Sequence, residues 1–480
     1  MGSLGSLEPL QDKVHIIIVA LPFYGHVRPL RSLAKSLAGL GYGITFVAGT
    51  GERKKIEAIS GAGFVPFKGR ADFDPDRLGE HFPGRPTEGM TAVWDIEHIF
   101  LDILPDQFDT LQEVLQQAMT AGRKTIVIQD GGFTGSLPSL LDSPKAIRVP
   151  TIGIGHFPLM ILSEDTAPFG TGLQSQGKEI NRQLNAGAIQ MFTSAHKRFV
   201  ELMEPYDCKQ SLPSEFPVDR WTEARIGHSL LTAASLDWVM LPDIYMQLCA
   251  PRLEPYRSDL PKNVRFCGTL TGSNDKKPHP SWWQEFVLDP NDKRPLIIVT
   301  SGSLQGLDVN HLIIPAITAC RDLPVRLIVC AVHIPYPEDL ELPLNTRWAK
   351  WIAFEGVFPY TSLIVSSGGY GGISQAFASG IPMILAGTSE DKAETGLRAE
   401  ATGAAINLKT QAPSVHQLSD ALDKMLHDTT YKQEAMELKK AYAECNAVGS
   451  IVKAVEELAD QFYGKKDSAR QSPTTAGASH

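Results

Sequence analysis

Cysteine is scarce in this chain and is not arranged in pairs. The 480 residues include six scattered cysteines, with no CxxC pair and no Cys/His ligand pattern. Such a sequence excludes a disulfide framework or a zinc finger and favours a reducing compartment over a secreted one. We therefore expect a cytoplasmic protein.

An excess of positive charge and a long apolar run are also missing. The formal net charge is -9 and no dense Lys/Arg cluster occurs, which argues against nucleic acid or an anionic membrane surface as the main partner. The strongest apolar run near the N-terminus, VHIIIVALPF, is too short to span a bilayer. We expect no membrane span and interpret this run as a buried strand.

The chain does contain a regular alternation of short apolar runs and helical segments. In the first half the runs are HIIIVAL, GITFVAG, FVPF, KTIVIQDGG and PTIGIGHFP. In the second half they are PLIIVTSGS, VRLIVCAV, TRWAKWIAF, SLIVSSGGYGG, IPMILAG and GAAINL. Apolar strands alternating with helices indicate parallel sheets covered on both faces. Because 480 residues exceed one ordinary core, we predict an α/β protein of two doubly wound Rossmann-like domains facing across a cleft.

A polar segment with two prolines, TGSNDKKPHPSWW, separates the two patterns. It predicts a first domain at residues 12–270, a linker at 271–290 and a second domain at 291–463. Residues 464–480 are expected to be a disordered tail. Two helices near the end of the chain are expected to open with capping boxes, at SVHQ and TYKQ.

A glycine turn follows one predicted strand of the second half. The segment SSGGYGGISQ has glycines at positions 368, 369, 371 and 372, where backbone N–H groups are open to a ligand. A helix that starts at about Gly372 would direct its positive end at an anion such as phosphate. For this motif alone, a tight structural turn is the favoured explanation, since glycine motifs are weak signals. The spacing differs from a dinucleotide-binding motif, and no Walker lysine follows.

The segment TSEDKAE follows the next predicted strand, at its carboxyl end, where open α/β sheets bind ligands. Alone it would be interpreted as a solvated run of charges. One βα unit after the glycine turn, it indicates the second half of a site, in which Asp391 and Lys392 hydrogen-bond sugar hydroxyl groups. The segment VTSGS, which follows the first strand of this domain, is a third element that could reach phosphate.

The second half resembles a known donor-binding signature. From WAKWIAF through SGGYGGISQAFASGIP to EDKAE, it is similar to the family 1 UDP-glycosyltransferases, in the fungal and bacterial branch with GGYGG and EDK. The resemblance covers nearly the whole chain. It implies the GT-B fold, with acceptor bound by the first domain and UDP-sugar by the second. It also implies a soluble, monomeric enzyme of secondary metabolism that uses a UDP-sugar, by default UDP-glucose, and no other cofactor.

The resemblance assigns roles to individual donor-site residues. Trp351 and Ile352 would lie at the uracil, and Gly371 and Gly372 would present N–H groups to the diphosphate, assisted by Ser303. The resemblance also implies that Gln375, eight positions after Ser367, contacts the ribose. The implied donor-binding residues are Ser303, Trp351, Ile352, Ser367, Gly369, Gly371, Gly372, Gln375, Asp391 and Lys392.

One of these residues departs from the family pattern. The family has His, or Asn in this branch, where this chain has Ser367. A serine hydroxyl can still donate to a phosphate oxygen, but the serine side chain is shorter than that of His or Asn and carries no charge.

His26 follows the first predicted strand, in the segment GHVRPL. This segment resembles the Gly-His-Val/Ile-x-Pro segment that carries the catalytic base of the family. Removing a proton from a hydroxyl group suits a neutral imidazole. Asp130 ends another strand of the same sheet, so its carboxylate is expected to orient the imidazole and stabilise the imidazolium. An isolated histidine is usually a capping or packing residue, but the motif and Asp130 together favour catalysis.

The expected reaction is an inverting sugar transfer without metal. Attack by the acceptor oxygen would displace UDP and convert an α-linked donor into a β-glycoside. No DxD motif and no His/Asp cluster of metal-ligand type occurs in the sequence. We therefore expect the glycine-turn helix to stabilise the leaving diphosphate.

The acceptor is expected to be a hydrophobic small molecule, such as a phenolic, polyketide, terpenoid or sterol. Irregular, aromatic-rich parts of the first domain would line its pocket, although each such residue could equally belong to the core. The candidate wall residues are Phe23, Tyr24, Trp94, Phe133, His156, Phe157 and Phe169.

Two alternative functions stay open at this point. A nucleotide-sugar epimerase of the same architecture would need further carboxylates near the sugar. A non-catalytic UDP-sugar-binding accessory protein would fit the change at Ser367. The pairing of His26 with Asp130 disfavours a pure binding protein, which has no need for a base.

Overall fold

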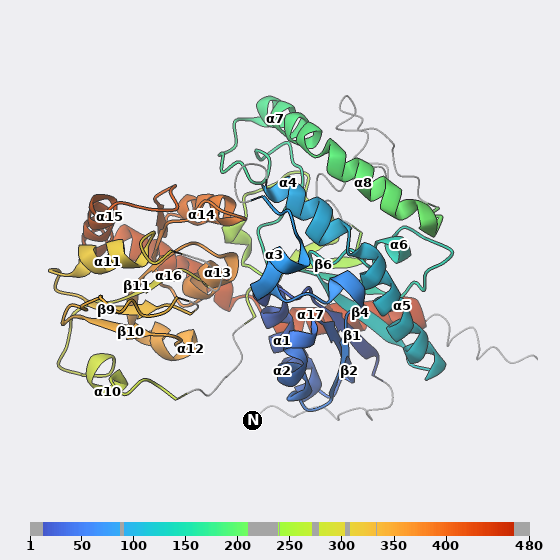
Figure 1. Cartoon of the computed structure of the whole chain (residues 1–480), viewed down its shortest axis with the longest axis horizontal. Coiled ribbons are helices and arrows are strands. Elements are labelled where there is room, and N and C mark those ends of the chain that lie inside the picture. Colours follow the sequence, from blue (N-terminus) through green and yellow to red (C-terminus); the bar gives the residue numbers. More distant parts are fainter. Residues whose placement is uncertain are drawn as a thin grey trace, which may run out of the picture.

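The computed structural model describes residues 13–86, 91–209, 239, 241–270, 278–302, 308–332 and 334–464. These residues form two α/β domains side by side, each built on a parallel sheet (Figure 1). The predicted α/β architecture with two doubly wound domains is therefore confirmed.

The first sheet has the strand order β3-β2-β1-β4-β5-β6-β7, with every pair parallel. Residues 16–19 of β1 are completely buried and alternate between two core clusters, since successive side chains point to opposite faces. The apolar run VHIIIVALPF is thus a central strand. The strands are β1 His15–Val19, β2 Ile44–Ala48, β3 Ala62–Pro66, β4 Thr125–Asp130, β5 Thr151–Gly155, β6 Ile244–Gln247 and β7 Val264–Phe266.

Helices cover both faces of this sheet. Leu30 and Leu33 of α1 pack on one face, and Leu111 and Leu115 of α5 pack on the other. This two-sided cover explains why the strands are apolar throughout. The helices are α1 Tyr24–Gly39, α2 Arg53–Glu57, α3 Leu78–His81, α4 Thr91–Asp95, α5 Leu104–Thr120, α6 Leu137–Leu140, α7 Lys178–Met191 and α8 Thr193–Met203.

The second sheet has the strand order β10-β9-β8-β11-β12-β13, again all parallel. Its central strand β8 is completely buried from residue 296 to 299. The strands are β8 Leu296–Thr300, β9 Arg326–Cys330, β10 Thr346–Ala349, β11 Thr361–Ser366, β12 Met383–Leu385 and β13 Ala405–Asn407. The helices are α10 Trp283–Phe286, α11 Ile313–Cys320, α12 Phe354–Val357, α13 Tyr370–Ala378, α14 Lys392–Ala401, α15 Val415–His427, α16 Thr430–Ala443 and α17 Ala447–Ala459.

Short helical turns complete the described elements. The 3-10 turns are η1 Thr50–Glu52, η2 Gly69–Ala71, η3 Pro75–Arg77, η5 Glu204–Tyr206, η8 Pro251–Leu253 and η9 Phe358–Tyr360. Two π-helical segments are η4 Ile96–Leu101 and η10 Asp460–Gly464.

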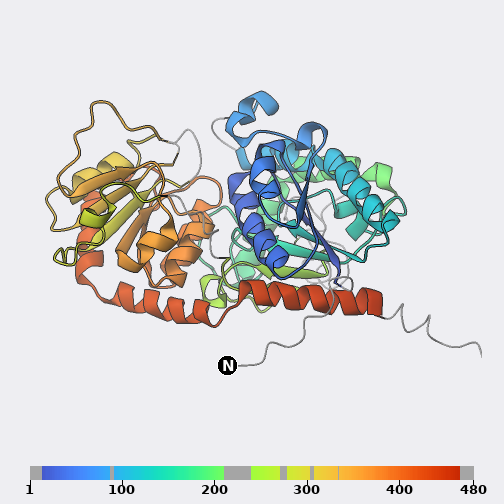
Figure 2. The ribbon, with the colours of Figure 1, turned by 90° about the horizontal axis from the view of Figure 1, so that it is seen from below.

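The last helix returns from the second domain to the first. Figure 2 shows α16 and α17 running in succession along one side of the molecule. Ile451 and Val455 of α17 belong to the same core cluster as Ile16 of β1. By its packing α17 is therefore part of the first domain, although the sequence analysis grouped it with the second. Its apolar stripe predicts a buried face but not the sheet that covers it.

Buried polar contacts join the two domains. The carboxylate of Glu254, which follows η8, accepts hydrogen bonds from Nε of Arg398 on α14 at 3.0 Å and from the Tyr370 hydroxyl on α13 at 3.2 Å. Burial would raise the pKa of Glu254, but the positive charges of Arg398 and Arg257 hold it below its ordinary value. On α14, Glu394 accepts hydrogen bonds from backbone N–H groups at positions 170 and 172 of the first domain. These contacts fix α13 and α14 relative to the first sheet.

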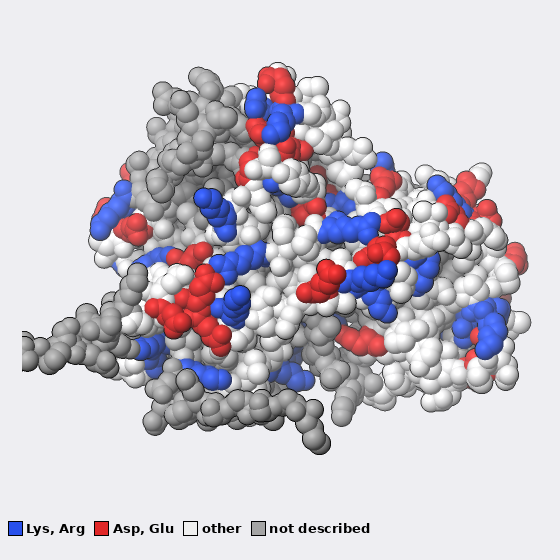
Figure 3. Space-filling view, turned by 180° about the vertical axis from the view of Figure 1, so that it is seen from behind, with Lys and Arg blue, Asp and Glu red and all other residues white. Residues whose placement is uncertain are grey.

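The charges on the surface are mixed. On the face shown in Figure 3, Lys and Arg side chains alternate with Asp and Glu side chains over both domains. Within the described part of the chain, no helix is both long and apolar enough to cross a membrane.

Candidate active site

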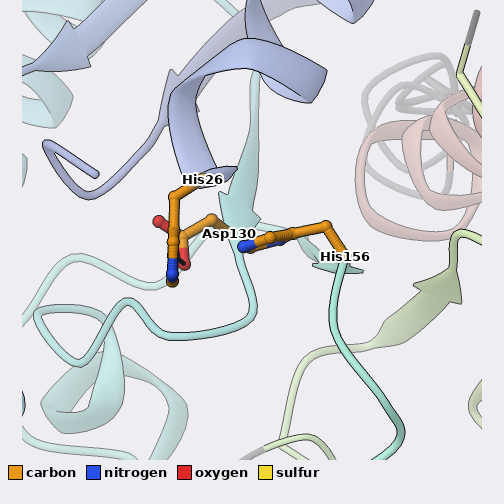
Figure 4. A group of neighbouring side chains, drawn as sticks. All are labelled: His26, Asp130 and His156. Carbon is orange, nitrogen blue, oxygen red and sulfur yellow. Dashed lines mark hydrogen bonds and ion pairs between the residues drawn. The ribbon is translucent and has the colours of Figure 1, made fainter. Parts of the chain in front are cut away.

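The carboxyl ends of β1 and β4 bring His26 and Asp130 together. The two strands pair in register, with Val19 opposite Gln129, so the residues that follow them start at the same edge of the sheet. His26 lies in the first turn of α1, and its Nδ1 is 3.1 Å from Oδ1 of Asp130 (Figure 4). The folded chain thus contains the His–Asp pair that the sequence predicted.

Asp130 is held in a fully buried position. Its Oδ2 accepts a hydrogen bond from the N–H of Leu21 at 2.5 Å, and its Oδ1 accepts one from the N–H of Gly132 at 2.6 Å. Burial would raise the pKa of Asp130, but the charge and hydrogen bond of His26, with the Leu21 N–H, hold it below its ordinary value. The carboxylate is therefore ionised at neutral pH and can only accept hydrogen bonds.

This arrangement determines the tautomer of His26. Because the Asp130 carboxylate accepts, Nδ1 of neutral His26 must carry the proton and Nε2 must carry the lone pair. The His26 side chain is 17% exposed, whereas that of Asp130 is completely buried. The free lone pair is thus on the side chain that a ligand can approach, as proton abstraction from a hydroxyl group requires.

Aromatic rings lie close to His26. The ring centroids of Phe23 and Phe157 are 5.5 and 6.2 Å from that of His26. Tyr24 is half-buried and donates its hydroxyl proton to Asp76 at 2.7 Å. These rings give the surroundings of His26 the apolar character expected for an acceptor pocket.

The other candidate wall residues lie in different surroundings. Trp94 and Phe169 are half-buried, and the Trp94 ring lies 4.5 Å from that of His98. Phe133 is completely buried and stacks on Phe67 in the core. In this structure Phe133 therefore has no surface to offer a ligand.

His156 lies beside the pair, just after β5. Its ring centroid is 4.3 Å from that of His26, with the two rings nearly perpendicular. Burial, assisted by the charge of His26, lowers the pKa of His156 to about 3. The sequence shows no local His/Asp cluster, but the fold assembles one from His26, Asp130 and His156, whose ligand atoms all lie within 4.8 Å of one another. Strand order, which spacing along the chain does not reveal, creates this group.

The glycine turn lies between β11 and α13, on the side of the second domain that faces the first (Figure 1). Helix α13 begins at Tyr370, two residues before the predicted start, with Gly369 as N-cap. Gly369, Gly371 and Gly372 are exposed, and a Cβ at any of them would meet nothing within 4 Å. The N–H groups of the first turn are thus open to an anion. Gly368 has φ +90°, which side chains rarely adopt.

Tyr370, inside the glycine motif, was not identified from the sequence as a functional residue. It is 3% exposed, and its hydroxyl group accepts a hydrogen bond from Gln247 at 2.8 Å and donates to Glu254. The signal in the sequence that could have identified Tyr370 is its position between two pairs of glycines. It anchors the exposed turn to the first domain.

The Ser367 hydroxyl group makes a hydrogen bond within the protein. Its buried hydroxyl group donates to the carbonyl oxygen of Ser301, at the end of β8, at 2.7 Å. The bond ties the loops after β8 and β11 together and uses the only proton of the hydroxyl group. The predicted phosphate contact of Ser367 stays a prediction, and Ser303 lies outside the described residues.

The remaining donor-site candidates follow β10 or lie on α13. Trp351 is half-buried after β10, whereas Ile352 is 5% exposed and packs in the core of the second domain. Gln375 lies on α13 one turn after Gly372 and is half-buried. Their roles at uracil and ribose stay predictions.

Asp391 and Lys392 lie where α14 begins. Lys392 is 4% exposed, and its Nζ contacts Glu390 and donates to the Ser389 hydroxyl at 3.0 Å. Burial raises the pKa of Asp391 to about 6, with a contribution from Glu390, while the charges of Lys392 and His26 act in the opposite direction. The charge of His26, in the first domain, thus acts on the pKa of Asp391 in the second domain.

Known proteins resemble the chain along nearly its whole length. Residues 325–458 match the family described as erythromycin biosynthesis protein CIII-like, C-terminal domain. UDP-glycosyltransferase 2 of Phaeomoniella chlamydospora is 36% identical over 462 residues, covering 93% of this chain and 96% of the relative. UDP-glucosyltransferase A1 of Starmerella bombicola is 30% identical over 465 residues, covering 95% of each.

A solved structure supports the fold. The glycosyltransferase of kitacinnamycin superposes with a TM-score of 0.68 at 18% identity, over 93% of this chain and 99% of that protein. At this identity the likeness concerns the fold, which is the GT-B arrangement of two facing Rossmann-like domains.

Proposed function

The chain belongs to the family 1 UDP-glycosyltransferases, and we propose that it transfers glucose from UDP-glucose to a hydroxyl group of a hydrophobic small molecule, with inversion. The observation that carries the mechanism is the pair of His26 with the buried, ionised Asp130. The family assignment replaces the epimerase and accessory-protein alternatives. Glucose is proposed because UDP-glucosyltransferases are among the relatives.

The first domain supplies the base. Nε2 of His26 takes the proton of the acceptor hydroxyl group while the oxygen forms a bond to C1 of the sugar and the C1–phosphate bond breaks. The buried carboxylate of Asp130 stabilises the imidazolium that results. Attack opposite to the leaving UDP gives a β-glycoside from an α-linked donor.

The second domain stabilises the leaving group. The exposed first turn of α13 directs N–H groups at the diphosphate, and each such charge–dipole contact contributes about 0.3–2 kcal/mol. Trp351 and Ile352 are proposed for the uracil and Gln375 for the ribose. This mechanism assigns no step to a divalent metal.

The sugar is proposed to bind at the start of α14. Asp391 accepts hydrogen bonds from sugar hydroxyl groups in its ionised form. Lys392 is already paired with Glu390, so its contact with the sugar depends on sharing its three N–H donors between the two. The effect of the His26 charge on the pKa of Asp391 supports a reaction centre between these two groups.

The acceptor is proposed to be a phenolic, polyketide, terpenoid or sterol. The half-buried aromatic rings of Phe23 and Phe157 near His26 support an apolar ligand, since such sites are mostly lined by apolar and aromatic groups. A monomer acting without an additional cofactor remains part of the proposal.

The test compares the wild-type protein with His26→Ala. Both are incubated with UDP-glucose, a chelator and a panel of phenols and terpenoid alcohols, and mass spectrometry detects an added hexose. We expect product from the wild type and a rate about 10²–10⁴-fold lower in the variant, because proton transfer loses its base. Calorimetry should give the same UDP affinity for both proteins. Equal transfer rates would contradict the role of His26, and failure to bind UDP would contradict the donor site.

A further inference from the structure

Three possible metal ligands converge next to the reaction centre. His26 comes from α1, Asp130 from the end of β4 and His156 from the residue after β5. Figure 4 shows the ring of His156 pointing toward His26 and Asp130, and the ring centroids of the two histidines are 4.3 Å apart. One nitrogen or oxygen atom of each residue lies within 4.8 Å of the others.

His156 presents a nitrogen atom whose lone pair is unused. Its Nδ1 lies 3.3 Å from the carbonyl oxygen of Ile154, and since a carbonyl can only accept, Nδ1 carries the proton. In neutral His156 the lone pair is then on Nε2, which is buried and has no hydrogen-bond partner among the described residues. A buried acceptor close to a carboxylate is unfavourable unless a cation or a donor lies between them.

We propose that His26, Asp130 and His156 form a site for Zn²⁺ or a similar transition-metal ion, and that the bound ion inhibits sugar transfer. Two imidazole nitrogens and one carboxylate oxygen are the ligands that Zn²⁺ prefers, with a fourth position left open. The backbone supports the ligands as in known zinc sites, since Ile154 accepts from the distal nitrogen of His156 and Leu21 donates to Asp130.

The geometry requires one small movement. Tetrahedral zinc with bonds of about 2.0–2.1 Å holds its ligand atoms about 3.3 Å apart. His26 and Asp130 are already 3.1 Å apart. The three ligand atoms lie within 4.8 Å of one another. To reach the spacing of about 3.3 Å, the His156 nitrogen has to move toward His26 and Asp130 by about 1.5 Å at most. Zinc replaces the proton between His26 and Asp130, which is released to solvent.

Inhibition follows from the shared atoms, and this part rests on the proposed function. A metal ion that occupies the Asp130 carboxylate and a His26 nitrogen removes the base from proton transfer. The exposed glycine turn of α13 contributes none of these ligands, so UDP binding should persist. Mg²⁺ prefers oxygen ligands and should neither bind here nor inhibit.

The test is a zinc titration of the full-length protein by calorimetry, after treatment with a chelator and dialysis. We compare wild type, His156→Ala and His416→Ala. His416 is a matched control, because its Nδ1 lies 2.9 Å from an Asp420 carboxylate oxygen on the exposed surface of α15, and no third possible ligand joins this pair among the described residues. Loss of a ligand should weaken zinc binding by at least about 10-fold in His156→Ala, while His416→Ala should match the wild type.

A second measurement does not depend on that variant folding. Co²⁺ added to the wild type should give the visible absorption of a tetrahedral site with nitrogen ligands, displaced by Zn²⁺, and His156→Gln should lose it. Transfer should be inhibited by Zn²⁺ but not by Mg²⁺ and restored by a chelator, with each variant compared to its own metal-free rate. Equal zinc affinity in wild type and both His156 variants would overturn the site. Zinc bound at the site without inhibition would overturn the role of His26 as base and leave the metal site in place.

Discussion

The turn between β1 and α1 and the turn between β11 and α13 share one backbone geometry and differ in chemistry. Each helix starts with Tyr-Gly after an extended N-cap residue. Phe23 has φ -66° and ψ 138°, and Gly369 has φ -66° and ψ 136°. Neither N-cap side chain makes a capping hydrogen bond. The same strand–turn–helix unit therefore occurs once in each domain, as FYGH and as GYGG.

Side chains account for the difference between the two turns. At the third helical position α1 has His26, which reaches a buried carboxylate, whereas α13 has Gly372, where a Cβ would meet nothing within 4 Å. The first turn thus presents a titratable group, and the second presents bare backbone N–H groups. One backbone geometry can serve either proton transfer or binding of an anion, depending on the side chains that it carries.

Asp130→Asn should have the largest effect and tests the first turn. Both carboxylate oxygens accept from N–H groups, so an amide NH₂ in place of one oxygen sets two donors against each other. A neutral amide also does not stabilise the imidazolium. We expect kcat to fall about 10²–10⁴-fold and the free energy of unfolding to fall by about 1–3 kcal/mol. Initial rates and denaturant unfolding measure the two effects.

Asp243→Asn is the matched control for this variant. Its carboxylate also accepts a backbone N–H, from Thr151 at 2.7 Å, and an Arg148 N–H at 2.7 Å, but at the start of β5 and without a histidine. It should lose similar stability and keep its kcat. If both variants lost kcat to the same extent, the loss would reflect the fold and not a His26–Asp130 mechanism.

Gly371→Ala tests the second turn, with Gly25→Ala as its counterpart at the same helical position. An added Cβ meets no protein atom within 4 Å at either site. Both variants should gain up to about 1 kcal/mol in the free energy of unfolding, because alanine favours the helix. Only Gly371→Ala should weaken UDP binding, by about 5- to 30-fold, since the methyl group covers N–H groups worth about 1–2 kcal/mol. Calorimetry with UDP measures this difference.

A different outcome would break the comparison between the turns. If Gly371→Ala bound UDP as tightly as the wild type, the backbone of α13 would not hold the diphosphate. If Gly25→Ala weakened UDP binding equally, diphosphate binding would not be specific to the α13 turn. Denaturant unfolding of both variants shows whether the fold is intact.

The strands of both sheets could largely be predicted, because each apolar run reports its own burial. Strands β6 and β7 were not identified, since IYMQ and VRF are short runs between prolines and polar residues. Of the two predicted capping boxes, the one at Ser414 is confirmed. The one at Thr430 is wrong, because α16 already starts at that residue, and its N-cap Thr429 makes no side-chain bond.

The site was predictable where a motif carried the information and not where packing did. His26 and Asp130 end neighbouring strands, so strand order alone brings them together. The contact between Ser367 and Ser301, the anchoring of Tyr370 and the third position of His156 depend on distances between loops. Local sequence does not encode these distances, since each is set by residues more than 20 positions apart.

The smallest expected effect concerns Asp391, the side chain proposed to bind the sugar beside the glycine turn. Its pKa is raised to about 6, mainly by burial, so it ionises between about pH 5 and 7. The ionised form accepts more hydrogen bonds from sugar hydroxyl groups than the protonated form. Binding of UDP-glucose should therefore tighten a few-fold as pH rises through 6, and Asp391→Asn should remove this dependence.

Comparison of UDP-glucose with UDP isolates the role of Asp391 from that of His26. UDP lacks the sugar, so its calorimetric affinity should change less over the same pH range. Any effect of the His26 charge on the diphosphate is common to both ligands and cancels in the comparison. Stability should follow the opposite sign. A raised carboxyl pKa means that folded Asp391 holds its proton more tightly than the unfolded chain, so its contribution is present below the unfolded pKa and lost as pH rises through about 6. If UDP-glucose affinity rises with pH while the free energy of unfolding falls, the Asp391 carboxylate binds the sugar at a cost in stability. If the affinities of UDP and UDP-glucose change equally with pH, Asp391 does not bind the sugar and the backbone turn alone binds the donor.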